Sequence, residues 1–132
     1  MKQEPNQNLK FRKNERLCSK KLFEKLGASN QRINAFPLRL IYLKTEQLPE
    51  NGTVQAAFVV PKRLFKKAVD RNRIKRQMRE AYRLNKAPLI QHCLSSNQKL
   101  ALLFIYLNTD SPNFNIIQEK LVLILQRVIK SA

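Results

Sequence analysis

The chain has 132 residues, with 26 Lys or Arg, 9 Asp or Glu, and a formal net charge of +17. Hydrophobic residues make up 43%, an ordinary share for a globular protein, which excludes a wholly disordered basic tail. The length is typical of one domain. A folded domain with this excess of positive charge calls for an anionic partner, and nucleic acid is the commonest large anion in a cell.

Signals for export, membrane insertion and metal binding are missing from the sequence. The longest candidate span, Leu121 to Leu125, is far shorter than the ~20 apolar residues that cross a bilayer, and the first fifteen residues contain no apolar core of a signal peptide. Cys18 and Cys93 are far apart, and His92 is the only histidine. We therefore expect a cytoplasmic protein in a reducing compartment, with no membrane partner and no metal bound by its own side chains.

The N-terminal part is predicted to contain an arm and a short helix. Residues 1–8 are polar and include a proline, so they predict a flexible arm, and residues 9–132 are expected to form a single domain. Ser19 is a suitable N-cap for a helix over residues 20–26, which Gly27 ends.

Three apolar runs predict strands. They cover residues 38–43, residues 54–60 after the turn at Asn51-Gly52, and residues 100–107. The last run is almost entirely apolar, so we expect it to be covered on both faces of the sheet.

Two longer helices complete the predicted order. One covers residues 71–84 and ends before Pro88, and the other covers residues 114–129, where apolar residues recur at helical spacing. The chain therefore reads as a helix, two or three strands, a helix, a strand and a helix, in one α+β domain.

Nearly half of the net charge lies in residues 61–83, which carry 10 basic and 2 acidic side chains, a net +8. On a helical wheel, one stripe about 100° wide is apolar and is expected to pack on a sheet, and it consists of Ile74, Met78, Ala81 and Tyr82. The opposite arc holds Asn72, Arg73, Lys75, Arg76, Arg79 and Arg83. Arg71 lies nearer the apolar edge in the first turn, where Asp70 could cap the helix. A planar guanidinium binds phosphate through two hydrogen bonds or stacks on a base, so this face favours RNA backbone and shape recognition.

The string AVDRNRIKRQMREAYR, Ala68 to Arg83, resembles the RNR signature of the bacterial ribonuclease P protein subunit. The resemblance extends over about residues 9–130, and outside residues 58–83 it depends on element order and apolar pattern. It implies a two-layer α/β sandwich of order α-β-β-β-α-β-α with a left-handed βαβ crossover, similar to domain IV of elongation factor G.

The function implied by the resemblance is that of a protein subunit without catalytic residues of its own. In this family a large catalytic RNA removes the 5′ leader from precursor tRNA with Mg²⁺, and the small basic protein assists it. The implied partners are the catalytic RNA and precursor tRNA, with no DNA, and Mg²⁺ is expected to act through the RNA.

The resemblance also implies two sets of site residues. Positions that match the RNR motif or its neighbours are expected to bind the catalytic RNA: Lys62, Arg63, Arg71, Asn72, Arg73, Lys75, Arg76, Arg79 and Arg83. The cleft that holds the leader in this family would be lined by Leu22, Leu26 and Ile41, with Phe36 and Phe58 as further neighbours.

This sequence departs from the family pattern in two places. The cleft helix often carries aromatic residues four apart, and here Leu22 and Leu26 take those positions, unless Phe23 points inward instead. An ordinary core role for Leu22, Leu26 and Ile41 therefore stays open. The stretch Leu64 to Lys67, between the basic pair and Ala68, is longer than in the family pattern. The match of Lys62 and Arg63 to the basic pair of the family therefore stays open.

Two other functions are compatible with the charge and size. A ribosomal or ribosome-assembly protein would share both. The RNR motif favours the ribonuclease P protein, whereas co-purification with a ribosomal subunit would favour the ribosomal alternative. A DNA-recognition helix would follow another helix across a short turn, whereas a predicted strand precedes residues 71–83. The acids are scattered and form no paired-carboxylate nuclease site.

Overall fold

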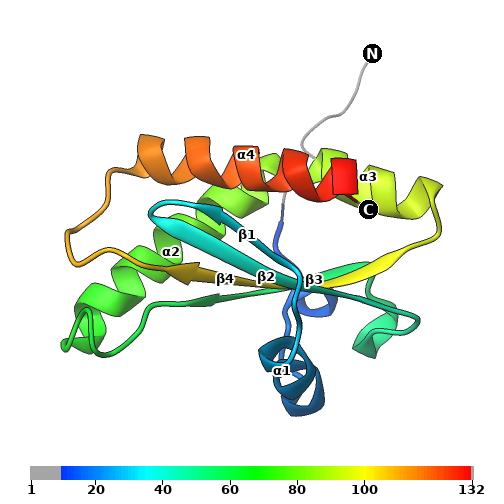
Figure 1. Cartoon of the computed structure of the whole chain (residues 1–132), viewed down its shortest axis with the longest axis horizontal. Coiled ribbons are helices and arrows are strands. Elements are labelled where there is room, and N and C mark those ends of the chain that lie inside the picture. The colour runs from blue at the N-terminus through cyan, green and yellow to red at the C-terminus, as the bar shows by residue number, and fades with distance from the viewer. Residues whose placement is uncertain (1–9, 132) are drawn as a thin grey trace.

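The computed structural model describes residues 10–131 and confirms the predicted α+β class (Figure 1). The predicted arm, residues 1–8, lies outside the described residues. One mixed sheet runs through the middle of the molecule, with three helices on one side and a short helix on the other (Figure 1).

The sheet has four strands in the order β1-β2-β4-β3. Their bounds are β1 Arg32–Ala35, β2 Leu38–Thr45, β3 Val54–Val59 and β4 Lys99–Tyr106. Strand β2 is antiparallel to β1 and β4, whereas β3 is parallel to β4. The three strands predicted from apolar runs are confirmed, and β1, a short strand in which only Ala35 is buried, is the fourth strand of the implied order.

The parallel pair β3 and β4 requires a crossover connection. Helices α2, Ala68–Asn85, and α3, Ala87–Ser95, form that connection. The left-handed sense of the crossover and the similarity to domain IV of elongation factor G stay predictions.

Helix α1, Lys20–Gly27, forms where the sequence predicts it. The Ser19 hydroxyl oxygen accepts a hydrogen bond from the Leu22 N–H at 3.3 Å, which satisfies one of the unpaired donors at the start of the helix. Leu22 and Leu26 are the two residues of this helix that are buried.

The sheet separates two hydrophobic clusters. On one face, α2 and α4, Phe114–Ser131, bury the larger cluster, which includes Tyr82, Phe104 and Leu121. On the other face, α1 covers the smaller cluster, which consists of Leu17, Leu22, Leu26, Ile41, Leu48 and Ala101. Because α1 is short, part of this second face stays only half-buried.

Two details around α2 differ from the sequence prediction. The helix begins at Ala68 after the N-cap Lys67, so Asp70 is not a cap; it lies in the first turn, where a negative charge favours the helix dipole. Pro88 follows the end of α2 as predicted, but it also opens α3, which the sequence prediction missed. Proline suits the first turn because its missing N–H has no acceptor there.

Residues 10–17 are attached to the rest of the domain by several contacts, and we call them the N-terminal segment. The Glu15 carboxylate forms an ion pair with the Nζ of Lys86, whose side chain is only 2% exposed. The Leu17 N–H donates to the Ala56 carbonyl at 3.0 Å, and the Gln55 side-chain amide donates to the Asn14 carbonyl at 3.1 Å.

Removing the Glu15 carboxylate leaves the buried Lys86 ammonium without its anionic partner. We expect Glu15→Ala to lower the free energy of unfolding by about 3 kcal/mol, measured by urea denaturation. Combining it with Lys86→Met removes the unpaired charge and should recover part of the loss. Equal unfolding midpoints for the wild type and Glu15→Ala would contradict the importance of this pair.

Candidate nucleic-acid interface

Helix α2 has one apolar and one basic face, as the wheel predicts. Ile74, Met78, Ala81 and Tyr82 are all fully buried against the sheet and α4. The basic side chains therefore project away from the core, where a ligand can reach them.

Several predicted RNA-binding residues have no partner among residues 10–131. Asn72, Arg76 and Arg79 are exposed and Lys75 is half-buried, and none of the four side chains has a hydrogen bond or ion pair with another described residue. Their donors are available for phosphate oxygens.

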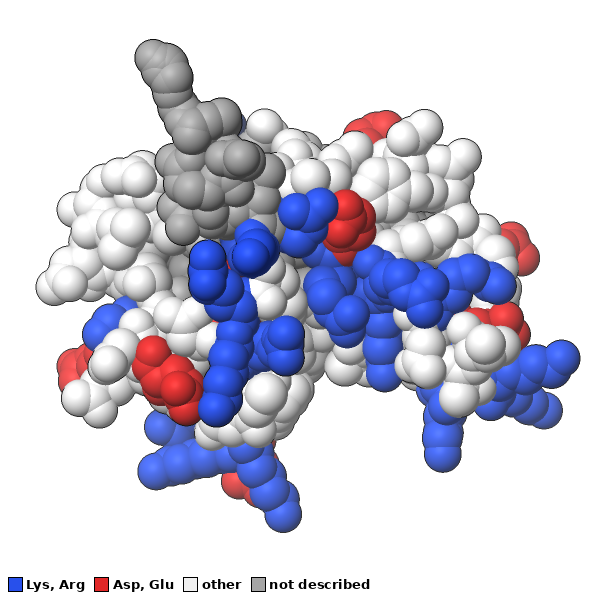
Figure 2. Space-filling view, turned by 180° about the vertical axis from the view of Figure 1, so that it is seen from behind, with Lys and Arg blue, Asp and Glu red and all other residues white. Residues whose placement is uncertain are grey.

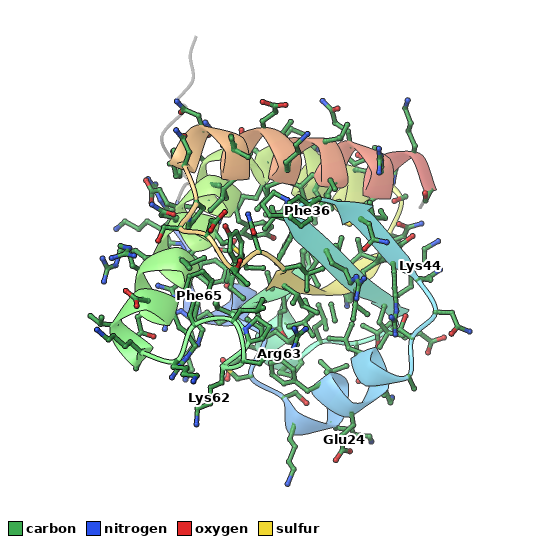
Figure 3. All side chains as sticks on the ribbon, turned by 60° about the vertical axis from the view of Figure 1, so that its left-hand side comes forward. Glu24, Phe36, Lys44, Lys62, Arg63 and Phe65 are labelled. Carbon is green, nitrogen blue, oxygen red and sulfur yellow. The ribbon has the colours of Figure 1, made fainter. Side chains whose placement is uncertain are left out.

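Lys62 and Arg63 extend from the loop between β3 and α2 (Figure 3). Both are exposed and carry no ion pair with any residue of the described range. The longer stretch that follows them does not push them into the interior, because Phe65 is buried and anchors the loop, and its N–H donates to the Pro61 carbonyl.

Three arginines of the predicted set are already engaged within the protein. Arg71 donates from Nη1 to the carbonyls of Phe65 and Lys66, at 2.8 Å each, so it holds the loop before α2. Arg73 pairs with Asp70 at 3.5 Å and donates to the Ser111 hydroxyl at 3.3 Å.

Arg83 forms two hydrogen bonds with Glu80, at 3.0 and 2.6 Å. These bonds lower the pKa of the Glu80 carboxyl and raise the pKa of the Arg83 guanidinium, so the pair stays ionised. A ligand phosphate would have to compete with the carboxylate for this arginine.

The N-terminal segment adds basic residues that the sequence analysis did not select. Arg12, Lys13 and Arg16 are exposed, and the attachment of the segment to β3 places Arg16 at the same pocket as Arg79 of α2. Figure 2 shows Lys and Arg side chains extending across one face of the molecule, with few acidic side chains among them. The sequence shows four cations in residues 10–16. It does not show that Arg16 lies near α2, which follows only from the pairing of the segment with β3.

The five residues predicted for the leader cleft do not come together. Leu22, Leu26 and Ile41 meet beneath α1 but are at most 7% exposed, so they form core there. Phe58 packs on the opposite face of the sheet, in the larger cluster. Phe36 lies in the turn between β1 and β2, is 65% exposed, and is near α4 rather than α1 (Figure 3).

A different set of residues lines the part of the sheet beside α1 that stays accessible. Ala57, Leu103 and Ile105 are half-buried on this side, together with Phe23 of α1, and we call these four residues the open sheet face. Leu103 and Ile105 are half-buried, so β4 is covered fully on one face and only in part on the other, which corrects the expectation of two covered faces. Phe23 supplies the single aromatic ring among these four residues. The sequence had left open whether Phe23 or the pair Leu22 and Leu26 faces the cleft.

Within residues 10–131, no three His, Cys, Asp or Glu side chains gather as a metal site would require. Most of the acids near the basic face form ion pairs: Glu15 with Lys86, Asp70 with Arg73, and Glu80 with Arg83. None of the helices in the described part of the chain is long and apolar enough to span a bilayer.

Comparison with known proteins gives one consistent family. The family model described as Ribonuclease P matches residues 11–129. The chain is 32% identical over 120 residues to the ribonuclease P protein component of Chlorobium phaeobacteroides, covering 84% of this chain and 82% of the relative. It is also 32% identical over 108 residues to the corresponding protein of Porphyromonas gingivalis, covering 80% and 77%.

Two solved structures share the fold. The RNase P protein of Staphylococcus aureus superposes with a TM-score of 0.68 at 17% identity, over 86% of this chain and 94% of the other. The RNase P protein from Thermotoga maritima gives a TM-score of 0.66 at 23% identity, over 86% and 96%.

The distinction between engaged and unpaired arginines can be tested by stability. We expect Arg71→Met to lower the free energy of unfolding by about 1–2 kcal/mol, because two carbonyl acceptors lose their donor. The matched change Arg76→Met should stay within about 0.5 kcal/mol of the wild type, since Arg76 has no partner to lose within the described range. Urea denaturation measures both, and equal losses would contradict the distinction.

Proposed function

The chain belongs to the ribonuclease P protein family, and from this premise we propose that it binds the catalytic RNA of ribonuclease P and the 5′ leader of precursor tRNA. Family membership makes it an RNA-binding component of a tRNA-processing ribonucleoprotein. The observation that carries the finer proposal is that three cations of α2, Lys75, Arg76 and Arg79, lie opposite its buried stripe and have no partner among the described residues.

In this proposal, the basic face contacts the catalytic RNA. Lys75, Arg76 and Arg79 offer donors that no carboxylate of the described residues occupies, so binding phosphate breaks no ion pair. Lys62 and Arg63 extend this surface beyond the start of α2, and the N-terminal segment extends it along β3. Arg71 acts mainly by holding the loop that carries the basic pair.

The open sheet face is our candidate for the leader. It is apolar, lies beside α1, and includes Phe23, on which a base could stack. This assignment revises the sequence-based set: Leu22, Leu26 and Ile41 support the surface from below, and Phe36 and Phe58 lie elsewhere.

We propose that the RNA supplies the catalytic groups and that Mg²⁺ acts through it. Among the described residues, the acids near the basic face do not fit a magnesium site, because magnesium is bound through unpaired carboxylates and Glu15, Asp70 and Glu80 are paired with cations. The protein's part is to lower the repulsion between phosphates and to orient the substrate. No step of the chemistry is assigned to its side chains.

Reconstitution with the cognate catalytic RNA tests the proposed function. We expect the protein to stimulate removal of the leader at low Mg²⁺, where an RNA enzyme most needs other cations to neutralise its phosphates. The assay follows release of the leader from end-labelled precursor tRNA. No stimulation at any Mg²⁺ concentration would overturn the proposal.

Arg76→Ala should weaken binding of the catalytic RNA and flatten its salt dependence. Loss of one phosphate contact lowers the slope of log K against log salt by about 0.7–0.9. Lys130→Ala, which removes one exposed charge at the far end of α4, is the control for net charge. Filter binding over a range of salt measures the slopes, and identical slopes for both variants would remove Arg76 from the interface.

Phe23→Ala should weaken binding of precursor tRNA that carries a leader and leave binding of mature tRNA unchanged. Loss of one stacked base corresponds to about 1–3 kcal/mol. Leu123→Ala, which removes a partly exposed apolar side chain from the outer face of α4, is the control. The holoenzyme's affinities for the two RNAs measure the effect, and equal losses for both would show that Phe23 only supports the fold.

A further inference from the structure

A pocket of about 370 Å³ lies where the N-terminal segment, the edge of β3 and helix α2 meet. It is lined by Phe11, Arg16, Ala56, Ala57, Phe58 and Arg79. Its volume is within the range of small-molecule sites. Ala57 also belongs to the open sheet face and Arg79 to the basic face, so the pocket lies between the two surfaces proposed above.

Aromatic rings form one wall of the pocket, and the core holds them from behind. The rings of Phe11 and Phe58 meet edge to face with centroids 5.9 Å apart. Phe58 is stacked on Phe104 at 5.5 Å, and Phe11 and Phe58 each contact Tyr82 at 5.9 Å. Because Tyr82 and Phe104 are fully buried, the two accessible rings have fixed positions.

Two cations border the same pocket from different elements. Arg16 comes from the N-terminal segment and Arg79 from α2, and both are exposed. Neither side chain has a hydrogen bond or ion pair within the described residues, and the lining includes no acidic residue. An unpaired pair of guanidinium groups beside aromatic rings suits a ligand that combines negative charge with a planar ring.

The edge of β3 adds polar backbone groups. β3 is the last strand of the sheet, and the segment pairs with it only at Ala56, whose carbonyl accepts from Leu17. Beyond this point, alternate N–H and C=O groups of Ala57–Val59 face away from β4 and have no neighbouring strand within the described part of the chain. They can form hydrogen bonds with the edge of a base.

We propose that this pocket takes one unpaired nucleotide of an RNA, a proposal that rests on the proposed function. Its base packs against Phe11 and Phe58, and Arg16 and Arg79 bind the phosphates on either side of it. A base in a duplex is stacked and paired and cannot enter, so the pocket selects single-stranded RNA. An inorganic anion would use the two arginines alone.

The test compares two RNA trinucleotides, one complete and one whose central nucleotide lacks its base. Both carry the same phosphates, so charge does not distinguish them. We expect the full-length protein to bind the complete trinucleotide about 5-fold to 150-fold more tightly, measured by calorimetry at fixed salt. Labelled phenylalanine rings should report the complete trinucleotide by chemical shift.

Matched variants separate the base from the phosphates. Arg79→Ala should weaken the binding of both trinucleotides and leave the ratio of the two affinities unchanged. Phe58→Leu should lower the affinity for the complete trinucleotide to that for the abasic one, so that the ratio approaches one. Lys130→Ala should change neither affinity. If Phe58→Leu does not fold, as judged by circular dichroism, Phe11→Leu takes its place, because Phe11 lies at the periphery of the aromatic cluster.

Equal affinities of the wild-type protein for the two trinucleotides would overturn the proposal and leave a site for phosphate only. An unchanged ratio in folded variants of Phe58 and Phe11 would also overturn it, because the base would then bind elsewhere. If the protein stimulates leader removal without distinguishing the trinucleotides, the pocket proposal alone fails. If it does not stimulate leader removal, the proposed function fails, whatever the trinucleotides show.

Discussion

The attachment of the N-terminal segment to the domain is the interaction on which the shape of the candidate interface depends. The buried ion pair of Glu15 with Lys86 fixes the segment at the junction of α2 and α3, and the hydrogen bond from Leu17 to Ala56 fixes it at the edge of β3. Without these contacts, Arg16 would not lie opposite Arg79, and the pocket would lose one wall. A buried ion pair adds little net stability, but it specifies one position because either partner alone is costly.

Basic residues in this protein have two different roles that charge alone does not separate. Arg71 is used within the fold, where it donates to the carbonyls of the loop before α2, and Arg83 is held by Glu80. Arg76 and Arg79 project from the same helix and have no partner within the described residues. The engaged residues hold the surface in place, and the residues without a partner in the described range are the ones that the proposed function assigns to phosphate.

Local periodicity explains how much could be predicted. The buried stripe of α2 was predicted correctly because the 3.6-residue repeat is a property of one helix. The five residues predicted for the leader cleft do not share one face, because Ile41 is in register with Leu103 and Ala57, which places Phe58 on the other face. Register between distant strands has no local signal. The partners of Arg71 and the neighbours of the N-terminal segment likewise depend on loop positions, which propensities do not specify.

The place of β4 in the sheet has a consequence for synthesis. It pairs with both β2 and β3, yet it is the last strand in the chain. Until about residue 106 has left the ribosome, β3 cannot pair with β4. The apolar stripe of α2 then has no complete sheet on which to pack. The most basic helix of the protein is therefore synthesised before the sheet that its apolar stripe packs on is complete.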